Sequence, residues 1–216
     1  MPINSYDVPN PTYYTLSAST YSSLSGIILG DWTEHFTNLK DGTELFYQRD
    51  INCIDCDLGR VINGKNMFAA CRSLTDFYGT LPSLVNGERM FYECTALTCF
   101  QCNESGGVVD LSSLSNGEMM FYYCGNLSEF NSDLSNLTNG YGMFSYCENL
   151  TKFDSDLSSL TNGHDMFADC HSLKSFNSDL SSLTNGEGMF FGCYNLTSFD
   201  ADLSSLKYGY DMFASC

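Results

Sequence analysis

Apolar and polar residues along this chain repeat with a period of 23 residues over most of its length. A Met-Phe pair recurs with a Gly three residues before each Met and a Cys four residues after it. The methionines are Met67, Met90, Met120, Met143, Met166, Met189 and Met212. The single longer step, of 30 residues, carries seven extra residues between Phe100 and Leu111. A fixed period of this size predicts a repeat solenoid.

One unit, residues 162–184, shows the elements that each coil is expected to contain. Its apolar positions are Met166, Phe167, Cys170, Leu173, Phe176, Leu180 and Leu183. The stretch between Leu173 and Phe176 predicts one short strand, and Asn162-Gly163 predicts a turn. The apolar spacing from Gly163 to Cys170 fits a turn, a 3₁₀ turn or a short helix. Because a single unit cannot bury its own apolar side chains, the units are expected to stack.

The repeat divides the chain into two predicted parts. Residues 1–43 do not match the repeat cleanly and are interpreted as an N-terminal cap, while residues 44–216 predict a solenoid of about seven coils. Residues 101–109, QCNESGGVV, are expected to form an insertion loop. The chain ends at Cys216 within a unit, so we expect either a longer protein or a last coil covered by another chain. Such an uncapped coil would allow end-to-end contact.

The motif G-x-x-M-F-x-x-C-x-x-L-x-x-F resembles the BspA-type leucine-rich repeat of bacterial surface proteins over roughly residues 44–216. It is also similar to the related Met-Phe-x-x-Cys repeats of gut and mucosal bacteria, although Met stands where the family usually has Ala. The resemblance implies a right-handed leucine-rich-repeat solenoid, adhesion or protein binding, and an extracellular or cell-surface location. It implies no catalytic residues and no cofactor.

The composition excludes two classes of partner. The formal net charge is −17, with nine Lys plus Arg against 26 Asp plus Glu. Nucleic acid and anionic membranes both attract basic surfaces, so neither is an expected partner. No stretch reaches the ~18 apolar residues of a membrane helix, and membrane insertion is not expected. The first residues, MPINSYDVPNPTYY, lack the basic and apolar segments of a signal peptide.

The cysteines fall into two sets. The seven that follow the Met-Phe pairs form a ladder, which we interpret as small buried hydrophobic residues. Four others form two Cys-x-x-Cys pairs, Cys53 with Cys56 and Cys99 with Cys102. Two such pairs can hold a zinc ion or form disulfides. A spacing of two coils separates them, however, and free thiols are the favoured interpretation.

An acidic row recurs at the same period, at Asp133, Asp156, Asp179 and Asp202. Stacked carboxylates can bind Ca²⁺. Asp side chains also accept backbone N–H bonds in turns. The turn interpretation is favoured, so no metal site is predicted here.

Variable positions of the repeat carry most of the candidate binding residues. These positions lie between Gly and Met, between Phe and Cys, and just after Cys, and they contain Tyr92, Tyr122, Tyr123, Tyr141, Tyr146, Phe191, Tyr194 and Tyr210. Tyrosine is a frequent contact residue at interfaces. If these rings project outward they form an aromatic, acidic binding edge. The alternative is that they are partly buried between coils.

No catalytic constellation stands out. His35, His164 and His171 show no relation to a nucleophile, and the neighbouring pair His164-Asp165 does not build a triad. The sequence therefore favours a non-catalytic module that binds a protein or glycan. The alternative is a structural spacer that presents another domain of a longer protein.

Overall fold

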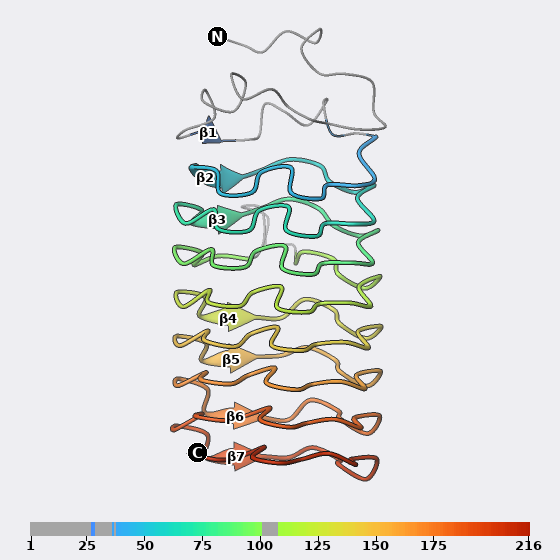
Figure 1. Ribbon diagram of the computed structural model, residues 1–216, viewed down its shortest axis with the longest axis vertical. Helices are drawn as coiled ribbons and strands as arrows, with labels where there is room; N and C mark the ends of the chain where they lie inside the picture. The colour runs from blue at the N-terminus through green and yellow to red at the C-terminus, as the bar shows by residue number, and fades with distance from the viewer. Residues whose placement is uncertain (1–26, 29–35, 37, 101–107) are drawn as a thin grey trace, which may run out of the picture.

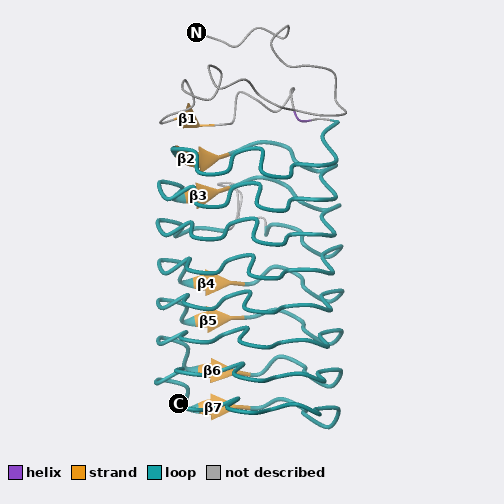
Figure 2. Cartoon of the chain, in the orientation of Figure 1, coloured by secondary structure: helices purple, strands orange, loops and turns teal. Residues whose placement is uncertain are grey.

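The structure, a computed structural model, describes residues 27–28, 36, 38–100 and 108–216. They form a stack of similar coils along one axis, from β1 at one end to β7 at the other (Figure 1). Short strands alternate with long stretches of turn and loop (Figure 2). The predicted repeat solenoid is therefore the observed architecture.

The strands are two to four residues long and pair in parallel between successive coils. They are β1 (Ile27–Ile28), β2 (Ile51–Ile54), β3 (Asp76–Phe77), β4 (Glu129–Phe130), β5 (Lys152–Phe153), β6 (Ser175–Phe176) and β7 (Ser198–Phe199). β1, β2 and β3 form one sheet, β4 pairs with β5, and β6 pairs with β7. The strand predicted between Leu173 and Phe176 is present as β6.

From Gly to Cys each coil is a chain of turns. In the coil that begins at Gly64, every second N–H closes a turn onto the carbonyl three residues before it. The N–H groups between them donate to the next coil, as Phe68 does to the Met90 carbonyl at 2.9 Å. Asn66 and Ala70 have φ values of 52° and 58°, and the same two positions are left-handed in the other described coils. Helices require negative φ at every residue, so the helical alternatives are wrong and the turn alternative is right.

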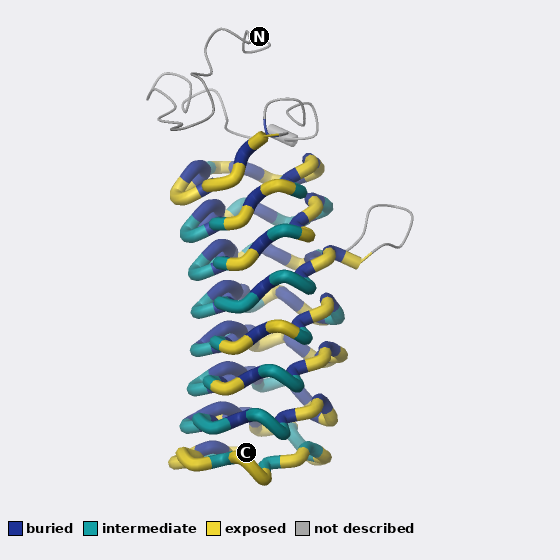
Figure 3. The backbone as a smooth tube through the Cα atoms, turned by 90° about the vertical axis from the view of Figure 1, so that its right-hand side faces the viewer, coloured by how far each residue is buried: buried dark blue, intermediate teal, exposed yellow. Residues whose placement is uncertain are grey.

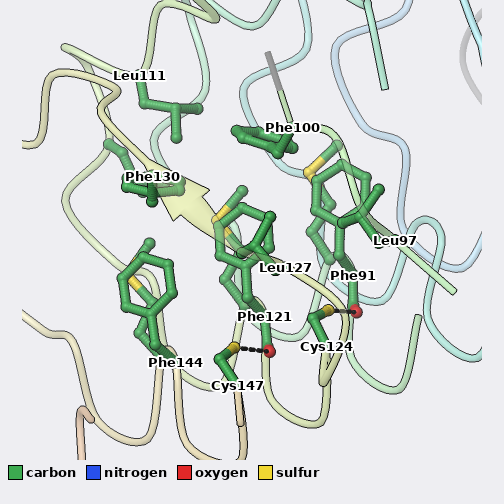
Figure 4. Packing of buried hydrophobic residues seen from close by; sticks show 14 of the residues in the cluster. Phe91, Leu97, Phe100, Leu111, Phe121, Cys124, Leu127, Phe130, Phe144 and Cys147 are labelled. Carbon is green, nitrogen blue, oxygen red and sulfur yellow. Dashed lines mark hydrogen bonds between the residues drawn. The ribbon is translucent and has the colours of Figure 1, made fainter. Parts of the chain in front are cut away.

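Two columns of phenylalanine rings fill the centre of the stack. One column follows the methionines and contains Phe46, Phe68, Phe91, Phe121, Phe144, Phe167, Phe190 and Phe213. The other lies on the strand side and contains Phe77, Phe100, Phe130, Phe153, Phe176 and Phe199. Rings stack within a column, as Phe91 does on Phe121 at 5.4 Å, and meet edge to face between columns (Figure 4). Each coil therefore completes the core of its neighbours.

The glycine that precedes each Met-Phe pair leaves space for the next coil. A Cβ at Gly140 would lie 2.9 Å from the Met166 sulfur and 3.2 Å from Leu160 Cδ1. Gly140→Ala should therefore lower the free energy of unfolding by about 1–3 kcal/mol through overpacking. Chemical denaturation checks this, with Gly125→Ala as the control, since a Cβ there meets only the Tyr146 carbonyl at 3.8 Å. Equal losses for the two variants would contradict this packing.

Most of the predicted N-terminal cap, residues 1–43, lies outside the described residues, as does most of the insertion loop 101–109. The Gly42 N–H donates to the Asn63 carbonyl at 2.8 Å, and β1 pairs with β2. Described residues before position 44 thus bond to the next coil as later coils do. The boundary at residue 44 and the number of coils stay predictions.

The last coil differs from the inner ones in exposure (Figure 3). Phe213 is 40% exposed, whereas Phe190 in the same column is fully buried. Leu203 and Leu206 are only partly buried, although their counterparts Leu180 and Leu183 are fully buried. End-to-end contact through this coil stays a prediction.

Candidate binding surface

The Gly-to-Cys turns hold the candidate tyrosines in place. In each inner coil the Met and Phe side chains are fully buried, and the residues around them lie nearer the surface. Tyr123 and Tyr146 occupy one of the two left-handed positions, with φ values of 60° and 61°. Equivalent residues of successive coils lie one above the other, about 4.8 Å apart if they follow strand spacing. The repeat therefore places these rings within stacking distance.

Four tyrosines from three successive coils form one cluster. Tyr92 stacks on Tyr122 with ring centroids 5.2 Å apart, and Tyr123 stacks on Tyr146 at 4.4 Å. Tyr122 also meets Tyr123 edge to face at 5.0 Å and Tyr146 at 5.4 Å. The two stacks are thus joined into a single aromatic surface.

The cluster continues over the next two coils through two polar side chains. The Asp169 carboxylate lies close enough to Tyr146 to raise the pKa of its hydroxyl, second to the effect of burial. Asp169 Oδ1 is 3.4 Å from His171 Nε2, and the His171 ring stacks on Tyr194 at 4.6 Å. We call the continuous set the aromatic strip; it consists of Tyr92, Tyr122, Tyr123, Tyr146, Asp169, His171 and Tyr194.

The other candidates lie beside the strip or apart from it. Tyr141 packs edge to face on His164 at 5.1 Å, and His164 Nε2 is 3.1 Å from Asp165 Oδ2. Phe191 and Tyr210 are 41% and 73% exposed, and within the described residues neither ring contacts another aromatic ring. Five of the eight predicted residues thus share one strip, and sequence reasoning missed Asp169 and His171. Their signal was positional, because they occupy repeat positions that hold Tyr146 and Tyr194 in neighbouring coils.

Both interpretations of the tyrosines hold in part. Tyr122 is half-buried between its neighbours, and burial followed by the nearby tyrosines raises its pKa to about 12. Tyr123 is 42% exposed and Tyr194 is 60% exposed. The strip is therefore an ordered stack with outer rings that solvent reaches.

The strip lies on turn segments that carry only negative charge beyond the third Met-Phe pair. The segments 117–124, 140–147, 163–170, 186–193 and 209–216 contain five acidic residues and no Lys or Arg. In earlier coils the acids are paired across coils, Glu88 with Lys65 at 3.0 Å and Glu93 with Arg72. Burial, with Glu187 and Asp169 nearby, raises the pKa of Asp165 against the opposing effect of His164.

An asparagine ladder beside the strip was not predicted. The side-chain amide of Asn139 donates to Asn116 Oδ1 at 2.9 Å, and Asn162 donates to Asn139 in the same way. Each Oδ1 also accepts a backbone N–H two residues later, as from Tyr141 to Asn139. The sequence analysis treated these asparagines only as turn residues. The ladder fixes the register in which the strip stacks.

The acidic row has the predicted turn role. Asp133, Asp156, Asp179 and Asp202 each accept the backbone N–H of a serine two residues later, at 2.7–2.8 Å. Because of that bond the pKa of Asp179 is lowered. Within the part of the chain that the structure describes, no three His, Cys, Asp or Glu side chains gather to hold a metal ion.

The cysteine ladder consists of buried thiols, except for the exposed Cys216 at the end. Each sulfur lies 3.1–3.3 Å from the carbonyl of a phenylalanine in the preceding coil, as Cys147 does with Phe121 (Figure 4). Those carbonyls also accept a backbone N–H, so the S–H satisfies a second lone pair. The interpretation as small buried residues is confirmed for the six inner cysteines.

The Cys-x-x-Cys pairs show no assembled site within the described residues. Cys53 lies in β2, half-buried, and pairs with Asp76, which in turn bridges to Cys99. Cys56 is buried in the core, and burial raises its pKa to about 12. A zinc ligand must be a thiolate, and this environment opposes ionisation. Cys102 lies outside the described residues.

The histidines show no catalytic arrangement in the described ranges. His164 and His171 each lie beside an aspartate, but no hydrogen bond joins either ring to a hydroxyl or thiol. The nearby ladder thiols face the interior and remain protonated. The described part of the chain thus assembles no nucleophile and base pair.

Comparison with known proteins identifies the family. The model of the BspA type leucine-rich repeat region matches residues 21–118 and 109–216, in six copies. No curated protein matches the chain. Among solved structures, a leucine-rich repeat protein from Bacteroides ovatus is similar at 20% identity and a TM-score of 0.36, over 73% of this chain and 60% of that one. None of the described residues belongs to a helix able to cross a bilayer. The chain belongs to the BspA-type leucine-rich repeat family.

Proposed function

We propose that this chain is a non-catalytic binding module that holds a protein or glycan ligand on the aromatic strip. The observation that carries the proposal is the joining of four tyrosines from three coils into one ordered cluster. Rings already fixed by stacking lose little conformational entropy when a ligand binds. Membership of the family supports an interaction role, and with it a place in a bacterial surface or secreted protein.

A structural spacer is the second candidate. Continuous backbone hydrogen bonds between coils and two stacked phenylalanine columns make the stack a rod that could hold other domains apart. In that case the outward tyrosines would serve only to cover the stack.

A binding screen separates the two candidates. The chain is immobilised and probed with matrix proteins, mucins and a glycan panel, beside a Tyr123→Ser/Tyr194→Ser variant. These are the two most exposed rings of the strip, so their loss should leave the fold intact. Loss of at least tenfold in affinity for a ligand found in the screen is expected.

The matched control removes two exposed tyrosines elsewhere, Tyr47→Ser and Tyr208→Ser, which are 43% and 65% exposed. It should bind as the parent chain does. A ligand that both variants bind normally would move the binding surface away from the strip. A blank over the whole panel would favour the spacer.

A further inference from the structure

Stacking leaves the edges of the strip's rings as its main outer surface. The planes of Tyr92 and Tyr122 differ by 1°, and those of Tyr123 and Tyr146 by 2°. Each stacked ring turns at least one face toward its neighbour, and Tyr122 is also covered edge to face. A sugar ring stacks on an open aromatic face, whereas hydroxyl oxygens at ring edges accept hydrogen bonds. The strip therefore suits a ligand rich in hydrogen-bond donors.

The charges around the strip point to the same kind of ligand. Asp165, Asp169 and Glu187 influence one another electrostatically in adjoining coils. Within the described residues none of the three forms an ion pair with Lys or Arg, and only His164 and His171 lie beside them. In the earlier coils, by contrast, Lys65 and Arg72 neutralise such acids. A partner that brings its own cations would supply what this surface lacks.

We propose that the strip binds an arginine- and lysine-rich segment of a protein. This inference rests on the proposed function and names the partner class for the same surface. Guanidinium and ammonium groups would donate to the carboxylates of Asp165 and Asp169 and to the hydroxyls of Tyr123 and Tyr146. Arginine suits the carboxylates best, because its planar fork donates two parallel bonds.

The length of the strip sets the size of the segment. The strip covers five coils, from Tyr92 to Tyr194, which is about 19 Å at about 4.8 Å for each step between coils. An extended peptide rises about 3.3 Å per residue, so roughly six residues would span it. An octapeptide is therefore long enough to test the whole surface.

The test is fluorescence anisotropy with labelled Arg-Gly-Arg-Gly-Arg-Gly-Arg-Gly and the same peptide with Gln in place of each Arg. The parent chain should bind the arginine peptide at least tenfold more tightly than the glutamine peptide. Asp165→Asn/Asp169→Asn should weaken that binding at least tenfold. Asn keeps the shape of Asp and tolerates the left-handed φ of both positions, so the variant should fold.

The matched control is Asp179→Asn/Asp202→Asn, which removes the same charge from the row of aspartates in turns. It should change affinity less than twofold. Equal weakening by both variants would mean attraction to the overall charge of −17, and would overturn the proposal. No binding of the arginine peptide would overturn it too. The proposed function would survive either result if a screened ligand still depended on Tyr123 and Tyr194.

Discussion

Raising the pH from 9 to 11 is expected to unfold the protein, because the thiol column must stay protonated in the folded chain. Burial raises the pKa of Cys71 and Cys193 from 9.0 to about 12, and that of Cys94, Cys147 and Cys170 well above 9.0. In the unfolded chain these thiols keep their ordinary pKa. Above pH 9 the unfolded state therefore loses protons that the folded state retains.

The stabilisation is fully present below pH 9 and is lost as the pH rises toward the folded-state pKa. Each thiol lowers the free energy of unfolding by about 1.4 kcal/mol per pH unit in that window. Six buried ladder thiols act together, so the combined slope approaches about 8 kcal/mol per pH unit, against a typical domain stability of about 5–15 kcal/mol. Tyr122, with a pKa of about 12, acts in the same direction above pH 10.

Urea denaturation followed by circular dichroism at pH 7, 9, 9.5 and 10 measures this slope. A Cys124→Ala/Cys147→Ala variant removes two of the six buried thiols and should reduce the slope by about a third. Its stability at pH 7 serves as the reference. A free energy of unfolding that stayed constant from pH 7 to 11 would show that the thiols are not held in the protonated core.

Phe121→Ala should lower the free energy of unfolding by about 3–5 kcal/mol. Phe121 is fully buried and stacks on Phe91 and Phe144 in its own column. It also meets Phe100 at 4.7 Å and Phe130 at 5.4 Å across the core. Removing the ring therefore leaves a cavity between three coils, and neighbours held by inter-coil hydrogen bonds cannot close it.

Phe213→Ala is the matched control, since Phe213 holds the same repeat position in the last coil. It is 40% exposed and contacts only Phe190 and Phe199 among the described rings. Its loss should cost less than about 1.5 kcal/mol. Chemical denaturation of both variants checks the difference, and equal losses would argue against a continuous core.

The sequence predicts the stacking of coils well because the period is itself the consequence of stacking. It could not distinguish turns from a helix between Gly163 and Cys170, since the apolar spacing suits both. The choice is made by hydrogen bonds to the next coil, as Asp165 N–H donates to the Glu187 carbonyl while holding a φ of 52°. Such a bond joins residues 22 apart and leaves no local signal.

The candidate surface was predicted in composition but not in connectivity. Tyr123 and Tyr146 stand one period apart, and their stacking follows from that spacing. Asp169 and His171 were missed because they were examined as a carboxylate and a histidine, not as occupants of the same variable positions. The asparagine ladder was missed because Asn139 and Asn162 look like ordinary turn residues until their register is known.

Hydroxyl-radical footprinting of the chain with and without its bound ligand tests most directly whether the strip is the binding surface. The account predicts that the ligand lowers the oxidation of Tyr123, Tyr146 and Tyr194, while Tyr47 and Tyr208 react as before. Protection of Tyr47 or Tyr208, with Tyr123 and Tyr194 still reacting at the rate of the free chain, would contradict it.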